Sequence, residues 1–123
     1  MHYENPFVSY SIKHGVLHMV CRQGVRITLA DARSIVADRL MVQGERPLPA
    51  VCELTGILDI DSDALEFFAR EGMVLISAIA FITNEKRHLN YLVQYFLKTS
   101  LSAIPSAVFS HMHQGLEFLK KHS

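Results

Sequence analysis

The fold is decided by residues 51–82, which read VCELTGILDIDSDALEFFAREGMVLISAIAFI. Residues 77–82 are apolar on successive positions, which is typical of an internal strand that helices cover on both faces. Residues 50–54 predict a second, shorter strand before the Thr55-Gly56 turn. Between the two strands, one helical face carries Leu65, Phe68 and Ala69. We predict a strand–helix–strand unit with residues 77–82 in the middle of the sheet.

The sequence before this unit predicts extended structure. Apolar residues alternate at Val8, Tyr10 and Ile12, which is the period of a half-buried strand. An extended pattern resumes over residues 16–21 and again over 25–27, each time after a break that contains glycine. We expect a hairpin or meander to open the domain.

Three further helices are predicted outside the central unit. Thr28 and Asp31 have the spacing of a helix start, and Gly44 and Pro47 end that helix. Its predicted buried stripe is Leu29, Ala32, Val36 and Leu40. Residues 87–99 have the clearest helical spacing, with apolar side chains at positions 89, 92, 93, 96 and 97. A short strand at 107–109 precedes a last helix with Leu116 and Leu119.

Alternation of strands and helices predicts an α/β fold. We expect a mixed, mostly parallel sheet of about five strands with four helices, and an opening strand that runs antiparallel at one edge. The 123 residues suit one domain, 1–123, in which residues 1–6 are expected to be a flexible N-terminus.

Composition and charge exclude several classes of function. Twelve basic side chains balance twelve acidic ones, so no basic excess is available to drive nucleic-acid binding, and we expect no nucleic-acid partner. The longest nearly apolar run, residues 72–82, is far shorter than the roughly 20 residues of a membrane-spanning helix. The sequence does not open with a secretory signal, so we expect a cytoplasmic protein in which Cys21 and Cys52 are reduced.

An acidic turn at residues 59–63 is the densest polar cluster. A calcium loop of the EF-hand type is excluded, because Ala64 and Arg70 stand where glycine and glutamate are needed. Asp59 and Asp61 resemble the phosphoryl-transferring aspartate pair of the haloacid dehalogenases, although Asp63 occupies the place of a small or β-branched residue there. The simplest interpretation is a helix start, with Asp61 or Ser62 as the cap and Asp63 in the first turn.

The order of elements around Ile60-Asp61-Ser62 resembles the STAS-like family, which includes bacterial anti-sigma factor antagonists and the cytoplasmic domains of sulphate transporters. More narrowly, the chain is similar to the small bacterial proteins called SpoIIAA-like or STAS/SEC14-like. The resemblance extends from the opening strands to the closing helix at residues 115–119. It implies a SpoIIAA-like fold and a regulatory, protein-binding role.

The resemblance also implies a docking point at the helix start, formed by Asp61, Ser62 and Asp63. In the antagonists, the second serine of an aspartate-serine-serine-glycine turn is phosphorylated. Asp63 stands at that position here, and Ala64 replaces the glycine. Aspartate carries a weaker negative charge than the roughly −1.5 to −2 of phosphoserine. Ser62 is either a helix cap or a displaced phosphate acceptor, and we favour the cap.

Further candidates lie toward the C-terminus. His88, Tyr91 and Tyr95 follow i, i+3 and i+7 on the predicted outer face of the 87–99 helix, and we predict that they join a homodimer or partner surface. His111 and His113 are close in sequence, but two ligands do not complete a zinc site. We therefore expect no metal and no cofactor.

Taken together, the sequence predicts a non-enzymatic regulatory or protein-interaction module that docks through residues 61–63. The alternative is a binder of a small apolar ligand or lipid, of the SEC14-like type that the resemblance also implies. Side chains that could line its cavity are Phe67, Phe68, Met73, Phe81 and Phe96. A phosphoryl-transfer enzyme that uses Asp59 and Asp61 is the third hypothesis.

Overall fold

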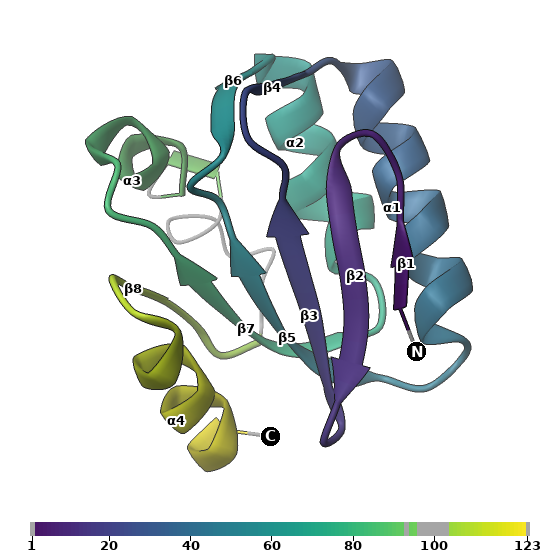
Figure 1. The fold of residues 1–123 in the computed structure, drawn as a ribbon, viewed down its shortest axis with the longest axis vertical. Coiled ribbons are helices and arrows are strands. Elements are labelled where there is room, and N and C mark those ends of the chain that lie inside the picture. The colour runs from purple at the N-terminus through teal and green to yellow at the C-terminus, as the bar shows by residue number, and fades with distance from the viewer. Residues whose placement is uncertain (1, 93, 96–103, 123) are drawn as a thin grey trace.

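The computed structural model describes residues 2–92, 94–95 and 104–122. A six-stranded sheet runs through the molecule, and a second sheet of two short strands lies at one end of it (Figure 1). In chain order the elements are β1 (His2–Glu4), β2 (Val8–Lys13), β3 (Val16–Cys21), β4 (Val25–Ile27), α1 (Leu29–Gln43), β5 (Leu48–Glu53), β6 (Ile57–Ile60), α2 (Ser62–Arg70), the 3₁₀ turn η1 (Glu71–Met73), β7 (Ile76–Ile82), α3 (Lys86–Leu92), β8 (Ser106–Phe109) and α4 (Met112–His122).

The larger sheet has the strand order β1-β2-β3-β5-β7-β8. β1, β2 and β3 pair antiparallel, whereas β3, β5, β7 and β8 pair parallel. The predicted α/β fold with a mixed, mostly parallel sheet and antiparallel opening strands is confirmed, with six strands where about five were expected. β7 is an internal strand, as predicted, but it lies next to the edge strand β8 and not in the middle of the sheet.

Helices cover both faces of the parallel half of the sheet. α1 and α2 lie behind the sheet in Figure 1, and α4 lies in front of it. Successive residues of β7 alternate between the two sides: Ile79 and Phe81 belong to the larger core, whereas Ala78 and Ala80 pack with Leu119 of α4. The continuous apolar run of β7 therefore follows from burial on both faces.

α1 begins and ends at the predicted residues. Thr28 Oγ1 accepts a hydrogen bond from the Asp31 backbone N–H, and the Asp31 carboxylate accepts one from the Thr28 backbone N–H. This reciprocal pair is a capping box. At the other end, Gly44 takes a φ of 75° and its N–H donates to the Leu40 carbonyl. Glycine adopts this left-handed conformation without the steric penalty that a Cβ would add.

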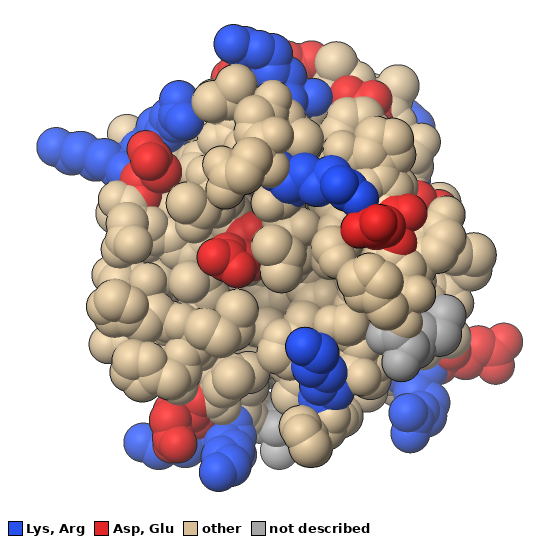
Figure 2. Space-filling view, in the orientation of Figure 1, with Lys and Arg blue, Asp and Glu red and all other residues tan. Residues whose placement is uncertain are grey.

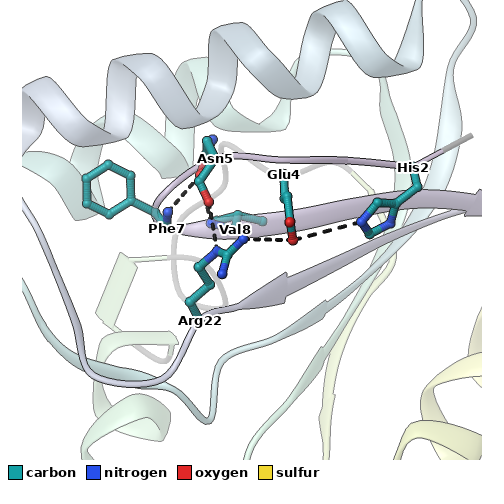
Figure 3. Close-up of polar contacts among 6 residues, drawn as sticks. All are labelled: His2, Glu4, Asn5, Phe7, Val8 and Arg22. Atoms are coloured by element: carbon teal, nitrogen blue, oxygen red, sulfur yellow. Dashed lines mark hydrogen bonds and ion pairs between the residues drawn. The ribbon is translucent and has the colours of Figure 1, made fainter.

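The N-terminus contradicts the expectation of flexibility, because residues 2–4 form β1 and pair with β2. Figure 3 shows the polar contacts that Glu4 and Asn5 make at this end of the chain. The Asn5 Oδ1 atom accepts from the backbone N–H groups of Phe7 and Val8, each at 2.8 Å. The Glu4 carboxylate lies 2.7 Å from the guanidinium of Arg22. These local contacts order a segment whose apolar content is too low to predict a strand.

The extended segment predicted at residues 25–27 is β4, but it pairs parallel with β6 in the smaller sheet and does not continue the opening hairpin of β2 and β3. β6 was not predicted, because it has only four residues. Gly56 places β6 against the loop after β3. A Cβ on Gly56 would lie closer than 3.0 Å to three backbone atoms, those of Cys21 and Arg22. Glycine is therefore required for the backbones to approach this closely.

Two further predictions concern cysteine and the membrane. Cys21 and Cys52 are both free thiols, as expected. Within residues 2–92, 94–95 and 104–122, no helix has the length and apolar character needed to cross a bilayer. The predicted 87–99 helix is seen as α3 at its start, while positions 93 and 96–99 lie outside the described residues.

Candidate functional site

The acidic turn links the end of β6 to the start of α2, and its polar side chains face outward. Asp59, Asp61, Ser62 and Asp63 are all exposed. Asp61 occupies the N-cap position, as predicted, but its side chain makes no capping hydrogen bond. Backbone atoms hold the turn instead: the Asp61 N–H donates to the Ile27 carbonyl at 3.0 Å, and its carbonyl accepts from the Leu65 N–H at 3.0 Å.

The two other carboxylates of the turn have local partners. Asp63 Oδ1 accepts from the Ala64 backbone N–H at 3.0 Å, which places negative charge in the first turn of α2. Asp59 Oδ1 accepts from the Tyr91 hydroxyl at 3.5 Å, a long hydrogen bond that joins the turn to α3. Ser62 is the first helical residue and not the cap. The turn therefore presents an exposed hydroxyl and an exposed carboxylate side by side.

His88 contradicts the prediction of an exposed stripe, because it is only 1 % exposed. Its Nε2 lies 2.9 Å from the Ile57 carbonyl, and its Nδ1 lies 2.8 Å from Thr83 Oγ1. A carbonyl only accepts, so Nε2 carries a proton and donates to it; in the neutral ring, Nδ1 then accepts from the Thr83 hydroxyl. The imidazole thus connects α3 to β6 and to the end of β7.

Burial of His88 reflects a different rotation of α3 from the one that the leucine spacing predicted. Leu89, assigned to the buried stripe, is 37 % exposed, whereas Leu92 is 2 % exposed. Tyr91 and Tyr95 are half-buried and pack against the larger core. His88, Tyr91, Leu92 and Tyr95 also follow helical spacing, so the sequence contained two competing stripes. The hydrogen bonds of the buried His88 ring favour the second stripe, which contains His88 and was predicted to be the outer face of the helix.

An internal cavity of about 100 Å³ lies between the sheet and the helices α1, α2 and α3. Its lining is mostly apolar and includes Phe68, Met73 and Phe81, three of the five side chains that the ligand-binding alternative named. Phe67 does not line it; its ring lies 5.2 Å from the Arg33 guanidinium carbon, which is a cation–π arrangement. Phe96 lies outside the described residues. The cavity reaches the acidic turn through Ile60.

Arg39 lines the same cavity and is only 2 % exposed. Its Nη1 donates to Gln43 Oε1 at 2.8 Å and to the Val74 carbonyl at 2.7 Å, and its Nη2 donates to the Gly72 carbonyl at 2.9 Å. Desolvation by burial lowers the pKa of Arg39, although arginine stays protonated in proteins. Sequence reasoning missed this residue, since arginine in an amphipathic helix is usually assigned to the solvent side.

Two cysteines also face the cavity, from the neighbouring strands β3 and β5. The adjacent Cys52 thiol and burial together raise the pKa of Cys21, so the thiol form is favoured. This agrees with their expected role as small buried side chains.

No group of three or more His, Cys, Asp or Glu side chains comes close enough to hold a metal ion within the described part of the chain. His111 and His113 stack with ring centroids 5.7 Å apart on the α4 side of the molecule. Figure 2 shows that charged side chains of both signs are scattered over the face that carries α4, and that neither sign gathers into one continuous patch.

Comparison with solved structures identifies a similar fold. An uncharacterised protein of the DUF3478 family with a SpoIIAA-like fold, from Shewanella loihica PV-4, superposes with a TM-score of 0.59. The match covers 95 % of this chain and 98 % of that one, at 12 % sequence identity. Such low identity establishes the fold and not the function.

Comparison at the sequence level gives one family. No curated protein matches the chain. The model of the domain of unknown function DUF7793 matches residues 10–123. These residues include β3, the helices α1, α2, α3 and α4, and the acidic turn between β6 and α2. The chain therefore belongs to the DUF7793 family, and its fold is SpoIIAA-like.

Proposed function

We propose that the protein is a non-enzymatic regulatory module that binds another protein through the start of α2. The observation that carries this proposal is the open, charged turn at Asp61, Ser62 and Asp63, whose side chains are exposed while backbone hydrogen bonds hold the turn in place. A surface that is fixed before binding loses little conformational entropy when a partner docks. The SpoIIAA-like fold supports the proposal, because the resemblance noted above implies docking at this turn.

The chemistry of the turn suggests a partner with a basic or hydrogen-bond-donating surface. Asp61 and Asp63 supply two negative charges at the positive end of the helix dipole. The Asp61 side chain makes no capping bond, so its carboxylate is available to a partner. Exposed rim charges of this kind mainly steer association and set specificity.

Charge reversal with a matched control tests the proposal. Proteins that copurify with the wild-type chain from its native cells are compared with those retained by Asp61→Lys/Asp63→Lys. The control variant Glu45→Lys/Glu117→Lys changes the net charge equally at exposed residues outside the turn. We expect at least one protein to be lost from the first variant and retained by the control. Equal retention by both, or turnover of a phosphorylated substrate by the purified chain, contradicts the proposal.

A second candidate function is supported by the cavity. We propose as the alternative that the space between the sheet and α1, α2 and α3 holds a small apolar molecule. An engineered cavity of about 150 Å³ stays dry and binds benzene. The cavity of about 100 Å³ therefore fits a molecule smaller than benzene and not a whole lipid. Native mass spectrometry of freshly purified protein distinguishes the candidates: a copurified small molecule favours the binder, and bare protein favours the interaction module.

The third hypothesis, phosphoryl transfer by Asp59 and Asp61, gains no geometric support. Both carboxylates are exposed, and neither lines the cavity. Asp59 accepts a hydrogen bond from the hydroxyl of Tyr91, which lies on α3 and not in the turn. A covalent phospho-aspartate detected by mass spectrometry after incubation with acetyl phosphate would establish this chemistry.

The homodimer is also a proposal. Tyr91 and Tyr95 are half-buried, so each residue keeps some surface in solvent, whereas His88 is removed from this surface by its burial. Light scattering of Tyr91→Ser/Tyr95→Ser gives the test, with circular dichroism to verify folding. An unaltered oligomer mass in the folded variant contradicts a role for the tyrosines.

A further inference from the structure

The cavity contains a buried positive charge that has no carboxylate partner. None of the ion pairs formed among the described residues includes Arg39, and its three hydrogen bonds end on an amide and two carbonyl oxygens. Neutral acceptors satisfy individual N–H groups but leave the charge uncompensated. Burying an ion without a counter-ion is strongly unfavourable. The molecule therefore offers a site at which a bound anion regains part of this cost.

The guanidinium has donors left for such an anion. Five N–H groups are available on an arginine side chain, and the observed hydrogen bonds use two on Nη1 and one on Nη2. The groups that remain are the Nε proton and the second Nη2 proton. A guanidinium that donates two hydrogen bonds matches the two oxygens of a carboxylate.

The shape and lining of the cavity define the rest of the ligand. Beyond Arg39 the walls are mostly aliphatic, aromatic or sulfur-containing, and they include Met19, Met73 and Ile79. Both ring nitrogens of His88, which also lines the space, are already engaged by protein atoms. The lining thus offers one charged group at Arg39 and apolar surface elsewhere.

The entrance is compatible with a charged head group. Gly72 and Met73 lie at the Arg39 end of the cavity, because the Gly72 carbonyl accepts from the Arg39 guanidinium. Both residues are half-buried, so this end approaches the surface. A ligand whose apolar body enters first leaves its anionic group near this end.

On these grounds we propose that the cavity binds a small monocarboxylic acid, with its carboxylate on the Arg39 guanidinium and its apolar body against Met19, Met73 and the β7 side chains. Benzene has six carbon atoms and fits a cavity of about 150 Å³, so a cavity of about 100 Å³ holds an apolar chain of about four carbon atoms. This inference rests on the second candidate function, the binding of a small apolar molecule, and adds the chemical class of the ligand.

Titration of the full chain with three probes tests the inference. Pentanoate, 1-pentanol and pentylammonium share an apolar chain and differ in the head group. Binding is followed by NMR of the methionine methyl groups. Met19 and Met73 report on the cavity. Met41, which is 57 % exposed, and Met112, which packs in the smaller core under α4, serve as controls in the same spectrum.

We expect pentanoate to shift the Met19 and Met73 methyl signals, to leave those of Met41 and Met112 in place, and to bind about tenfold more tightly than 1-pentanol, since a charge-assisted hydrogen bond contributes at least about 1.4 kcal/mol. Pentylammonium is expected not to bind. Binding of 1-pentanol as tightly as pentanoate overturns the inference and leaves the apolar-ligand function standing. Failure of every probe to shift Met19 or Met73 overturns both.

A substitution at Arg39 gives a second, independent readout. Arg39→Met removes the charge and keeps an unbranched side chain, so the preference for pentanoate over 1-pentanol should be lost or reversed, since an unpaired carboxylate is costlier to bury than a hydroxyl. Retention of the tenfold preference in this variant contradicts the role of Arg39. Because Arg39 also stabilises the loop after η1, the probe series on the wild-type chain keeps the inference testable if the variant does not fold.

Discussion

His88 shows at the scale of one residue how hydrogen bonding decides the orientation of a helix. The side chain fills a position in which a β6 carbonyl and the Thr83 hydroxyl both lie within hydrogen-bond distance of the ring. No other side chain offers a donor and an acceptor at opposite corners of one rigid ring. This complementarity explains why a polar residue is buried while Leu89 is left partly in solvent.

Replacement of His88 is expected to destabilise the protein strongly. His88→Ala removes the ring partner of the Thr83 hydroxyl, leaves the Ile57 carbonyl with only the longer 3.3 Å hydrogen bond from Arg87, and opens a cavity, so the free energy of unfolding should fall by about 2–4 kcal/mol. His88→Gln retains one amide donor for the Ile57 carbonyl and should lose less. Urea denaturation followed by circular dichroism measures both, with His113→Ala as an exposed control expected within about 0.5 kcal/mol of wild type. Equal stability of His88→Ala and His113→Ala would contradict the assignment.

His18 gives the protein a pH-dependent stability. Burial, and then the nearby Lys13 and His14, lower the pKa of His18 below its ordinary 6.5. The unfolded chain therefore takes up a proton near pH 6.5 while the native chain does not, so the free energy of unfolding decreases as the pH falls through this value. His18→Gln should show a smaller decrease between about pH 7.5 and about pH 5.5 in urea titrations. An identical decrease in the two proteins would exclude His18 as the source.

The sequence predicted the start of α2 in the acidic turn but not the residues around it. Asp61 is the N-cap, as the pattern indicated, whereas Ser62 is the first helical residue and not the cap that we favoured. Arg39 was missed and His88 was placed on the outer face, because a single sequence does not reveal which polar side chains find buried partners distant in the chain. The Arg39 contacts span 33 and 35 residues, and those of His88 to Ile57 span 31.

At the element scale, the small β4–β6 pair positions the acidic turn. Ile27 of β4 lies beside Ile60 of β6, and the Ile27 carbonyl accepts from the Asp61 N–H, so the end of one short strand fixes the start of α2. Gly56 holds β6 to the loop between β3 and β4, since its carbonyl accepts from the Gly24 N–H at 2.8 Å. The geometry of the candidate site thus depends on a glycine outside it.

Substitution of Gly56 is expected to disturb both stability and the turn. A Cβ at this position would overlap the Arg22 carbonyl oxygen, so the two backbones must move apart. We expect Gly56→Ala to lower the free energy of unfolding by about 2–4 kcal/mol. At Gly72, by contrast, a Cβ would meet the Phe68 side chain at 3.4 Å, an ordinary contact, and the matched Gly72→Ala variant should stay within about 1 kcal/mol of wild type. Thermal denaturation of the two variants compares them directly, and equal melting temperatures would contradict the close approach.

Helices and strands were predicted correctly where the sequence pattern was long. They were missed where a few specific side-chain contacts determine the structure. α1 was predicted through its capping residues and β7 through its apolar run, and both are confirmed. β1 was missed because side-chain and backbone contacts of Glu4 and Asn5, and not apolar content, hold it. The order of strands follows from crossovers between distant segments, which periodicity alone does not specify.

At the scale of the whole molecule, two features lie on the same side of the sheet. The acidic turn presents charge to solvent, and the cavity beneath it contains one buried cation. Ile60 borders both, because it belongs to the strand that ends at the turn and also lines the cavity. The chain carries no net charge, and the acidic turn places three of its twelve acidic side chains within five residues.

Docking through the start of α2 is the central claim, and site-specific photo-cross-linking in the native cells tests it most directly. A photoreactive amino acid is placed at Ser62, and in a second protein at Glu117, which is exposed on α4. We predict a cross-linked protein species at position 62 that is absent at position 117 and is lost when Asp61→Lys and Asp63→Lys are added. A chain that cross-links at 117 and not at 62, or at neither position, would contradict the claim.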